Sequence, residues 1–259
     1  MPGERFTDIR RFDSIDSTNR YLLDEARSGA AEGVVAVAGH QTSGRGRLGR
    51  RWEAPPRSNL LVSVLLRPDL APEQRHLASA VVALAAADAV LSTTALDLGI
   101  KWPNDLLAGD GRKVAGVLAE ADLGDTPGPQ RPPIVVGIGI NANWPVDDRD
   151  LPPELLGVAT SLRQQAGRAI DLDGLLGAFL AALEPRVADL ASAAGRRRQA
   201  AALRDRCTTL GTRVRVELPL GRFEGVATGL TPEGHLVVEE AGVSRIVVAG
   251  DVVHCRSLA

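Results

Sequence analysis

Apolar residues gather in short runs that glycine, proline and charged residues separate. Runs rich in valine, isoleucine and leucine predict buried strands, and a weaker run near the N-terminus predicts one more. The predicted strands span residues 5–15, 34–38, 60–66, 97–102, 113–121 and 134–140. A glycine-containing turn at 108–112 predicts a hairpin that ends in the strand 113–121.

Helical spacing of apolar residues occurs in the segments between and after these strands. The predicted helices span residues 18–28, 72–92, 172–192 and 196–207. The first follows Asp16-Ser17-Thr18-Asn19, which are residue types that cap helices. The second is rich in alanine and leucine and should face the core. Pro185 predicts a bend or break in the third, and Arg196-Arg197-Arg198 is interpreted as the solvated start of the fourth.

From residue 208 onward the sequence consists of short runs typical of β-strands, separated by glycines and Pro232. They predict strands at 213–218, 221–230, 235–239 and 244–248, which would form a small barrel-like domain. We therefore expect an α/β domain over residues 1–207, with a sheet flanked by helices, and an all-β domain over residues 208–259.

Composition is ordinary for a globular protein, with 44 % hydrophobic and 24 % charged residues. The net charge of -2 gives no overall attraction to nucleic acid or to an anionic membrane, so a cationic site must be local. Cys207 and Cys255 form no paired motif and no signal peptide is recognised, which predicts a cytosolic protein with reduced thiols. The longest apolar run, 77–91, contains Ser79 and Asp88 and is judged too short to span a bilayer, so no membrane segment is expected.

The segment from Gln41 to Trp52 alternates glycine with arginine and ends in an indole. Glycines let a backbone approach an anion, and guanidinium groups bind two anionic oxygens at once, so the segment predicts an anion-binding loop. Taken alone, the run also fits a solvated loop or a nucleic-acid contact that tolerates many sequences. With so little apolar surface, the loop is expected to be disordered without its ligand.

Polar residues also follow the predicted strands. The hairpin would bring Lys101, Asn104, Asp105 and Lys113 together at one end of the sheet. Lys101 and Lys113 are the two lysines among 30 basic residues, which indicates that a compact ammonium is needed at both positions. Four of the five asparagines and all three tryptophans lie in these strand-end, loop or cap segments, Asn59 being the exception. The four histidines are scattered without ligand spacing, so no built-in metal site is predicted.

Five motifs occur in an order that a known family shares. They are Asp16-Ser17-Thr18-Asn19, Gly44-Arg45-Gly46-Arg47-Leu48-Gly49-Arg50, Lys101-Trp102-Pro103-Asn104-Asp105, Lys113-Val114-Ala115-Gly116 and Gly137-Ile138-Gly139-Ile140-Asn141. Through them the whole chain resembles the biotin–protein ligases. The resemblance implies a class II synthetase-like catalytic domain, with a mixed sheet flanked by helices, followed by a small SH3-like β-barrel. It also implies a monofunctional member that does not bind DNA, because no N-terminal winged helix precedes the catalytic motifs.

The resemblance implies a reaction in two steps. The carboxylate of biotin attacks the α-phosphate of ATP to give biotinyl-5′-AMP and pyrophosphate, and a lysine of a carrier protein then attacks the acyl carbon. Biotin and ATP would be the substrates, with Mg²⁺, and the partner would be the biotin carboxyl carrier domain of a biotin-dependent carboxylase. The oligomeric state is left open.

By motif match, the resemblance also implies residue roles. The neutral ureido head of biotin would be bound by Ser17, Thr18, Asn19 and Gln41. The rest of the biotin site would be Arg45, Gly46, Arg47 and Lys113. The nucleotide would be bound by Arg47, Arg50, Trp52, Asn104 and Asn141, with Trp52 on the adenine and Arg50 on the leaving phosphates with Mg²⁺. The catalytic residues would be Arg47, Lys113 and Asp105, of which Asp105 would orient the acceptor lysine and help to remove its proton.

Two alternatives stay open. A lipoate–protein ligase shares the fold and the adenylation chemistry, although the Gly-Arg loop and the motif at 101–105 favour biotin. A non-catalytic arginine-rich RNA-binding module fits the loop, but the net acidity and the lack of interleaved aromatic residues beyond Trp52 count against it. Leu48 departs from the family pattern, because many relatives have a basic residue there.

Overall fold

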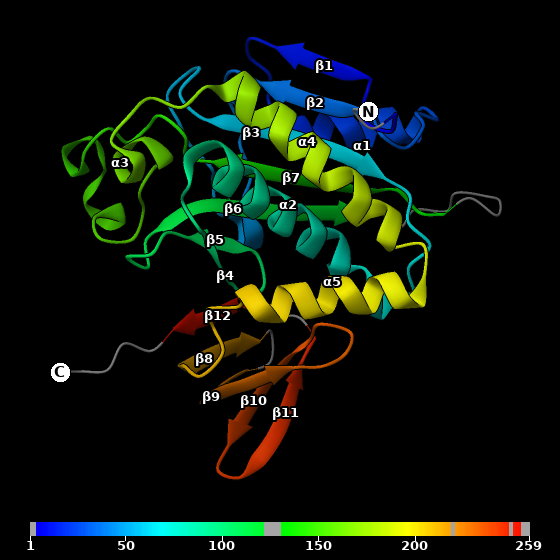
Figure 1. Ribbon diagram of the computed structural model, residues 1–259, viewed down its shortest axis with the longest axis vertical. Coiled ribbons are helices and arrows are strands. Elements are labelled where there is room, and N and C mark those ends of the chain that lie inside the picture. Colours follow the sequence, from blue (N-terminus) through cyan, green and yellow to red (C-terminus); the bar gives the residue numbers. More distant parts are fainter. Residues whose placement is uncertain (1–3, 122–130, 219–220, 249–250, 255–259) are drawn as a thin grey trace.

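The computed structural model describes residues 4–121, 131–218, 221–248 and 251–254. Its larger part is built on a seven-stranded sheet with the strand order β1-β2-β3-β7-β6-β5-β4 (Figure 1). The strands are β1 (Ile9–Phe12), β2 (Val35–Ala38), β3 (Leu60–Leu66), β4 (Gly99–Lys101), β5 (Asp105–Leu107), β6 (Lys113–Ala121) and β7 (Ile134–Ile140). β1 and β2 are parallel and the other neighbours are antiparallel, so the predicted mixed sheet is confirmed.

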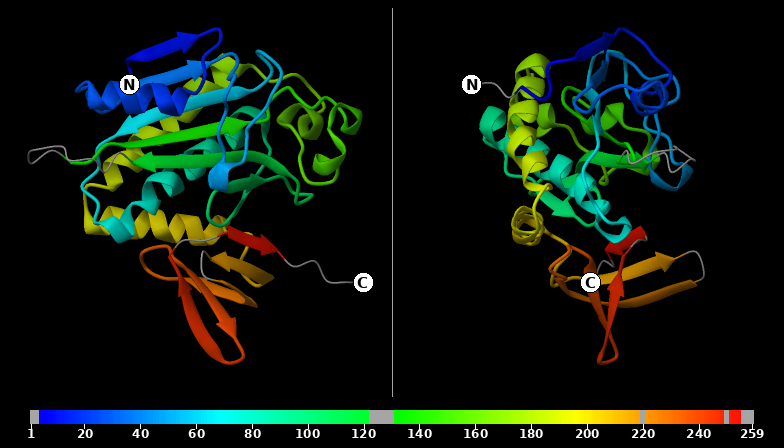
Figure 2. Two further views of the ribbon diagram at one scale, coloured as in Figure 1. Left: turned by 180° about the vertical axis from the view of Figure 1, so that it is seen from behind. Right: turned by 90° about the vertical axis from the view of Figure 1, so that its right-hand side faces the viewer.

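Helices cover both faces of this sheet. α1 (Thr18–Arg27) lies on one face, and α2 (His76–Thr94) lies on the other, where α4 (Leu172–Asp189) and α5 (Ala193–Arg206) pack against it (Figure 2). Ser17 is the N-cap of α1, and its side chain accepts a hydrogen bond from the backbone N–H of Arg20. A short helix, α3 (Leu162–Ala166), was not predicted.

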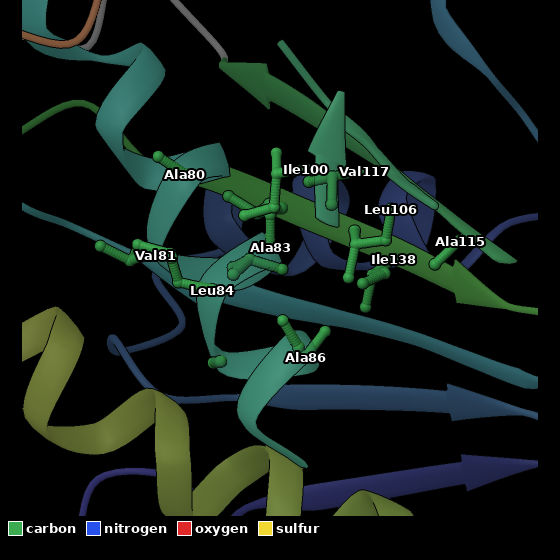
Figure 3. Close-up of a cluster of buried hydrophobic side chains, with 14 of the residues drawn as sticks. Ala80, Val81, Ala83, Leu84, Ala86, Ile100, Leu106, Ala115, Val117 and Ile138 are labelled. Carbon is green, nitrogen blue, oxygen red and sulfur yellow. The ribbon is translucent and has the colours of Figure 1, made fainter. Parts of the chain in front are cut away.

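The core lies between α2 and the strands. Figure 3 shows Ala83 and Leu84 of α2 among Ile100, Leu106 and Ile138 of the sheet. Most of α2 is buried, because the sheet covers one side and two helices cover the other. By length and composition the segment Pro72–Thr94 could cross a membrane, so the expectation that it is too short was wrong. Within the protein, 67 % of its most apolar window is buried, which fits a core helix.

Three predicted elements differ from the structure. α4 continues through Pro185 to Asp189, so the predicted break is absent. Leu183 and Val187, on either side of the proline, are buried, and their packing stabilises the helix there. An additional strand, β5, divides the predicted hairpin into two. α5 begins at Ala193 after the N-cap Ser192, so the three arginines lie inside its first turns. The glycine- and proline-rich stretch 124–133, which predicts a surface loop, falls mostly outside the described residues.

The C-terminal part forms a second sheet with the order β11-β10-β9-β8-β12, in which all neighbours are antiparallel. Its strands are β8 (Arg213–Leu218), β9 (Gly221–Leu230), β10 (Leu236–Glu240), β11 (Val243–Val247) and β12 (Asp251–His254), of which the last was not predicted. Within the described residues the edge strands β11 and β12 do not pair with each other.

Trp102 joins the two parts of the molecule. It is 2 % exposed, its Nε1 donates to the carbonyl oxygen of Gly234 at 3.2 Å, and its backbone N–H donates to Oγ1 of Thr209 at 2.9 Å. His76 and His235 meet at the same interface, with ring centroids 4.3 Å apart, so these two histidines are not scattered as the sequence indicated. Burial, together with the neighbouring His235, lowers the pKa of His76. The boundary between residues 207 and 208 stays a prediction.

Replacing Leu84 by alanine is expected to lower the free energy of unfolding by about 2–5 kcal/mol, because a buried side chain is lost and a cavity remains. Leu84 is fully buried between α2 and the sheet, with 0 % exposure. Leu91→Ala on the same helix is the control, since Leu91 is 41 % exposed, and should cost less than about 1 kcal/mol. Urea denaturation measures both, and equal losses would contradict this packing.

Candidate active site

A cavity of about 380 Å³ lies beneath the segment that joins β2 to β3. This segment crosses the sheet on the side away from α2 (Figure 2). All thirteen site residues expected from the sequence line the cavity: Ser17, Thr18, Asn19, Gln41, Arg45, Gly46, Arg47, Arg50, Trp52, Asn104, Asp105, Lys113 and Asn141. The volume lies in the range of small-molecule binding sites. Segments that are distant in sequence therefore meet in one pocket, as predicted.

Three glycines form the floor of the pocket. Gly137 pairs with Ser63 of β3 and Leu118 of β6, and Gly139 pairs with Gly116. A Cβ atom on Gly139 would lie 2.5 Å from Cε2 of Trp52, and one on Gly137 would overlap Oδ1 of Asn19. The glycines of the motif at 137–141, which had no predicted role, thus leave room for side chains to lie flat on the sheet.

Neutral hydrogen-bonding groups occupy one end of the pocket. Oε1 of Gln41 accepts from the backbone N–H of Thr18 at 2.8 Å and from its hydroxyl at 3.1 Å. Oγ of Ser63 lies 2.7 Å from both Oγ1 of Thr18 and Oδ1 of Asn19. Ser63 was missed from the sequence, although it is the one polar residue in the strand β3 and this was the available signal.

The arginine loop, residues 41–52, is folded as a narrow hairpin. The backbone N–H of Gly46 donates to the carbonyl oxygen of Arg50 at 2.7 Å, and that of Trp52 donates to Gly44 at 3.0 Å. Leu48 lies at the tip, 68 % exposed, with a left-handed φ of 58°. Disorder of this loop in the absence of ligand stays a prediction.

Side chains of the loop reach strand β6 and the turn between β4 and β5. Nη1 of Arg45 pairs with Oε1 of Glu120 at 2.9 Å, and Nη1 of Arg47 donates to Oδ1 of Asn104 at 2.9 Å. The amide of Asn104 also donates to the carbonyl oxygen of Val117 at 3.0 Å, so its orientation is fixed. The loop is therefore held against the pocket by β6 and by the turn between β4 and β5.

Lys113 and Trp52 close the cationic end of the pocket. Nζ of Lys113 pairs with Oδ1 of Asp105 at 2.7 Å and lies 5.5 Å from the centroid of the Trp52 ring. The indole rests on Gly139, and its Nε1 is buried without a hydrogen-bond partner. Lys101 lines the same pocket, so the four polar residues that the hairpin was predicted to gather are together.

Asn141 is supported by a residue outside the predicted motifs. Its Oδ1 accepts from Nδ2 of Asn59 at 3.2 Å, and its Nδ2 donates to the carbonyl oxygen of Thr160 at 3.1 Å. Asn59 also accepts from the backbone N–H of Ala142 at 3.0 Å and so shapes the turn after β7. No sequence pattern connects Asn59 with Asn141, because they are 82 positions apart and the pairing of β3 with β7 brings them together.

An apolar wall completes the pocket. Leu151, Leu155, Val158 and Ala159 line it, and none of them was predicted. No group of three or more histidine, cysteine, aspartate or glutamate side chains that could hold a metal ion occurs among the residues that the structure describes.

Comparison with known proteins identifies the family. The profile of the Biotin/lipoate A/B protein ligase family matches residues 11–141, and that of the Biotin protein ligase C terminal domain matches residues 209–255. The biotin–[acetyl-CoA-carboxylase] ligase of Mycobacterium tuberculosis is 38 % identical over 93 % of this chain and 86 % of its own length. This chain belongs to the biotin protein ligase family. The predicted ligase activity and the predicted fold class are thereby confirmed.

Two further relatives of this ligase agree. The bifunctional ligase/repressor BirA of Bacillus subtilis is 32 % identical over 92 % of this chain and 71 % of its own length. The biotin protein ligase of Aquifex aeolicus, solved in complex with biotin and ATP, has a TM-score of 0.80 and 27 % identity, and the match covers 97 % of this chain and 100 % of that one.

The glycine floor of this ligase can be tested by adding one methyl group. Gly137→Ala is expected to lower the free energy of unfolding by about 1–3 kcal/mol, because the new Cβ displaces the amide of Asn19 and leaves buried polar groups unpaired. Gly109→Ala is the control, since a Cβ there meets no atom within 4 Å. Differential scanning calorimetry compares the two, and an unchanged Gly137→Ala protein would contradict the crowding at this position.

Proposed function

We propose that this ligase uses ATP to activate biotin as biotinyl-5′-AMP and then transfers the biotinyl group to a lysine of a biotin carboxyl carrier domain. The observation that carries the proposal is that two kinds of side-chain cluster line one cavity: neutral groups bonded to one another around Thr18, and cations that include Arg47 and Lys113. A molecule with a polar neutral head and an anionic tail fits these two clusters.

The neutral end supports biotin over lipoate. Ser17, Thr18 and Gln41 line it, as does Ser63, and each offers a hydroxyl or an amide. The ureido ring of biotin has N–H donors and a carbonyl acceptor that such groups can satisfy. The dithiolane ring of lipoate has neither, so it would leave these polar groups unpaired, which is costly for residues as buried as Thr18 and Ser63.

The cationic end supports adenylation. An oxygen of the biotin carboxylate attacks the α-phosphorus of ATP, the new C–O–P link forms, and pyrophosphate leaves with the electron pair of the broken P–O bond. Both reactants are anions, so Arg47 and Lys113 are proposed to reduce their repulsion and to stabilise the developing charge. Arg45 and Gly46 would bind biotin beside them.

The remaining loop and strand-end residues are proposed to bind the nucleotide. Trp52 would pack on the adenine and Asn104 and Asn141 would donate or accept hydrogen bonds. Arg50 would bind the leaving phosphates. We propose that Mg²⁺ arrives with the phosphates of ATP, because magnesium is usually held by substrate phosphates and waters and by few protein carboxylates.

Asp105 is proposed to act in the second step. The nitrogen of the acceptor lysine attacks the acyl carbon, the C–O bond to AMP breaks, and the nitrogen loses a proton. A free lysine has a pKa of about 10.4, so a carboxylate that orients the ammonium and assists this loss speeds the attack. Oδ1 of Asp105 pairs with Lys113, and a carboxylate has a second oxygen for the acceptor.

We further propose that the carrier domain belongs to a biotin-dependent carboxylase and that the reaction takes place in the cytosol, without DNA or membrane partners. The relatives with named acceptors support the carboxylase. We also propose residues 1–207 and 208–259 as the two domains, since the two sheets use separate stretches of chain.

Incubation of the purified protein with biotin, ATP and Mg²⁺ should produce biotinyl-5′-AMP and pyrophosphate, and addition of a carrier domain should increase the mass of one of its lysines by one biotinyl group. Mass spectrometry detects both products. Reactions without ATP, and reactions with lipoate in place of biotin, are the controls. Formation of lipoyl-AMP in preference to biotinyl-AMP would overturn the proposed substrate.

Asp105→Asn is expected to slow transfer to the carrier by about 10²–10⁴-fold and to leave adenylate formation within about tenfold of the parent, because the lost carboxylate acts on the acceptor amine. Single-turnover assays with preformed adenylate separate the two steps. Asp110→Asn is the control, since Asp110 lies in the adjacent turn and pairs with Arg112 at 2.8 Å. An unchanged transfer rate would exclude this role.

A further inference from the structure

A ring of side-chain hydrogen bonds begins and ends on the arginine loop. Gln41, at the start of the loop, bonds to Thr18, and Ser63 bonds to both Thr18 and Asn19. Asn19 bonds to Glu120, which pairs with Arg45, four residues after Gln41. Glu120 is thus the link through which the sheet holds both the loop and the neutral end of the pocket.

The amide of Asn19 is fully oriented by this ring. Its Nδ2 donates to Oε2 of Glu120 at 2.9 Å and to the carbonyl oxygen of Leu118 at 3.2 Å, which uses both of its hydrogens. Its Oδ1 lies over Gly137 and faces Oγ of Ser63 at 2.7 Å. Asn19 is 3 % exposed, so a mispaired amide would be costly there.

The orientation of Asn19 determines which way Ser63 points its hydrogen. An amide oxygen can only accept, so the single hydroxyl hydrogen of Ser63 goes to Asn19. The 2.7 Å contact with Thr18 then needs the hydroxyl hydrogen of Thr18, and Gln41 keeps the backbone N–H of Thr18 as its donor. One lone pair of Ser63 is left as an acceptor. Ser63 lines the pocket, where an acceptor suits an N–H group of a ureido ring. An ionised Glu120 can only accept, so it holds the N–H₂ group of Asn19 towards itself and the oxygen of Asn19 towards Ser63. In this way Glu120 favours the donor and acceptor pattern of Ser63 without touching it.

The contact with Arg45 gives Glu120 a second effect. The side chain of Glu120 is 19 % exposed, whereas that of Arg45 is 53 % exposed, so a largely buried carboxylate on β6 anchors a more exposed loop cation. A charge-assisted hydrogen bond of this kind is stronger than one between neutral groups. Loss of the carboxylate would release the loop at Arg45 and loosen Asn19 at the same time.

We propose that Glu120 is a positioning residue that couples closure of the arginine loop to the hydrogen-bonding pattern at the neutral end of the pocket. This inference rests on the proposed function, because it concerns how the pocket binds biotin. Glu120 is not among the thirteen residues expected from the sequence and does not itself line the cavity. Its effect should fall on binding of biotin and leave the chemical step unchanged.

Glu120→Gln keeps the shape of the side chain and removes its charge. It is expected to raise the KM for biotin in adenylate formation about tenfold, in line with the loss of a hydrogen bond to a charged group, with kcat within about twofold of the parent. Limited trypsin digestion of the ligand-free protein should cut faster after Arg47, Arg50 and Arg51. Glu120→Asp, which retains the charge, should recover part of the affinity.

A double-mutant cycle identifies the contact. If Glu120 and Arg45 act through one another, the double variant with Glu120→Gln and Arg45→Met should lose much less affinity than the product of the two single losses. Glu25→Gln is the matched control, because it breaks an ion pair with Arg10 at 2.5 Å outside the pocket and should leave the KM for biotin unchanged.

Three results would overturn the inference while the proposed function stands. The first is an unchanged KM for biotin together with unchanged digestion of Glu120→Gln. The others are a fall in kcat at constant KM, and affinity losses in the cycle that multiply fully. Absence of biotinyl-AMP from the parent protein would instead overturn the proposed function. In that case the digestion rates of the four proteins in the cycle still decide whether Glu120 and Arg45 are coupled.

Discussion

The pocket depends on the absence of side chains at three positions of two adjacent strands. Gly116 on β6 and Gly137 and Gly139 on β7 leave the sheet bare, and Asn19 and Trp52 lie directly on its backbone. A strand normally projects a side chain onto each face at every second residue, and such a side chain here would occupy the site. Strand pairing therefore fixes the place of the cavity, since the register aligns the glycines with each other and with Ser63.

The two ends of the pocket are built by different means. The neutral end rests on a helix cap, on β3 and on the start of the loop, where short hydrogen bonds between buried groups hold each donor and acceptor in place. The cationic end uses longer side chains from the loop and the hairpins, paired with carboxylates or amides. A cluster of short, buried hydrogen-bonding side chains is thus joined to longer, partly exposed charged ones.

Much of this arrangement follows from sequence patterns, and the remainder depends on tertiary contacts. The strands at 60–66, 113–121 and 134–140 agree with the predicted bounds, because short, largely apolar runs are a local signal. The thirteen site residues were found through motifs and do share one cavity. Asn59, Ser63 and Glu120 were missed because each acts on a residue far along the chain. The intact helix at Pro185 and the inward-facing Trp102 reflect packing that outweighs local preference.

The scarcity of lysine has a chemical consequence for an enzyme that handles an acyl phosphate. Mixed anhydrides of this kind react with free amines, and the two lysines of this chain, Lys101 and Lys113, both line the pocket. Apart from these two lysines, the 30 basic residues are all arginines. Their guanidinium groups stay protonated at neutral pH and do not attack acyl carbons. An escaped intermediate therefore finds hardly any amine on the outer surface of the protein that made it, and self-labelling is suppressed by composition alone.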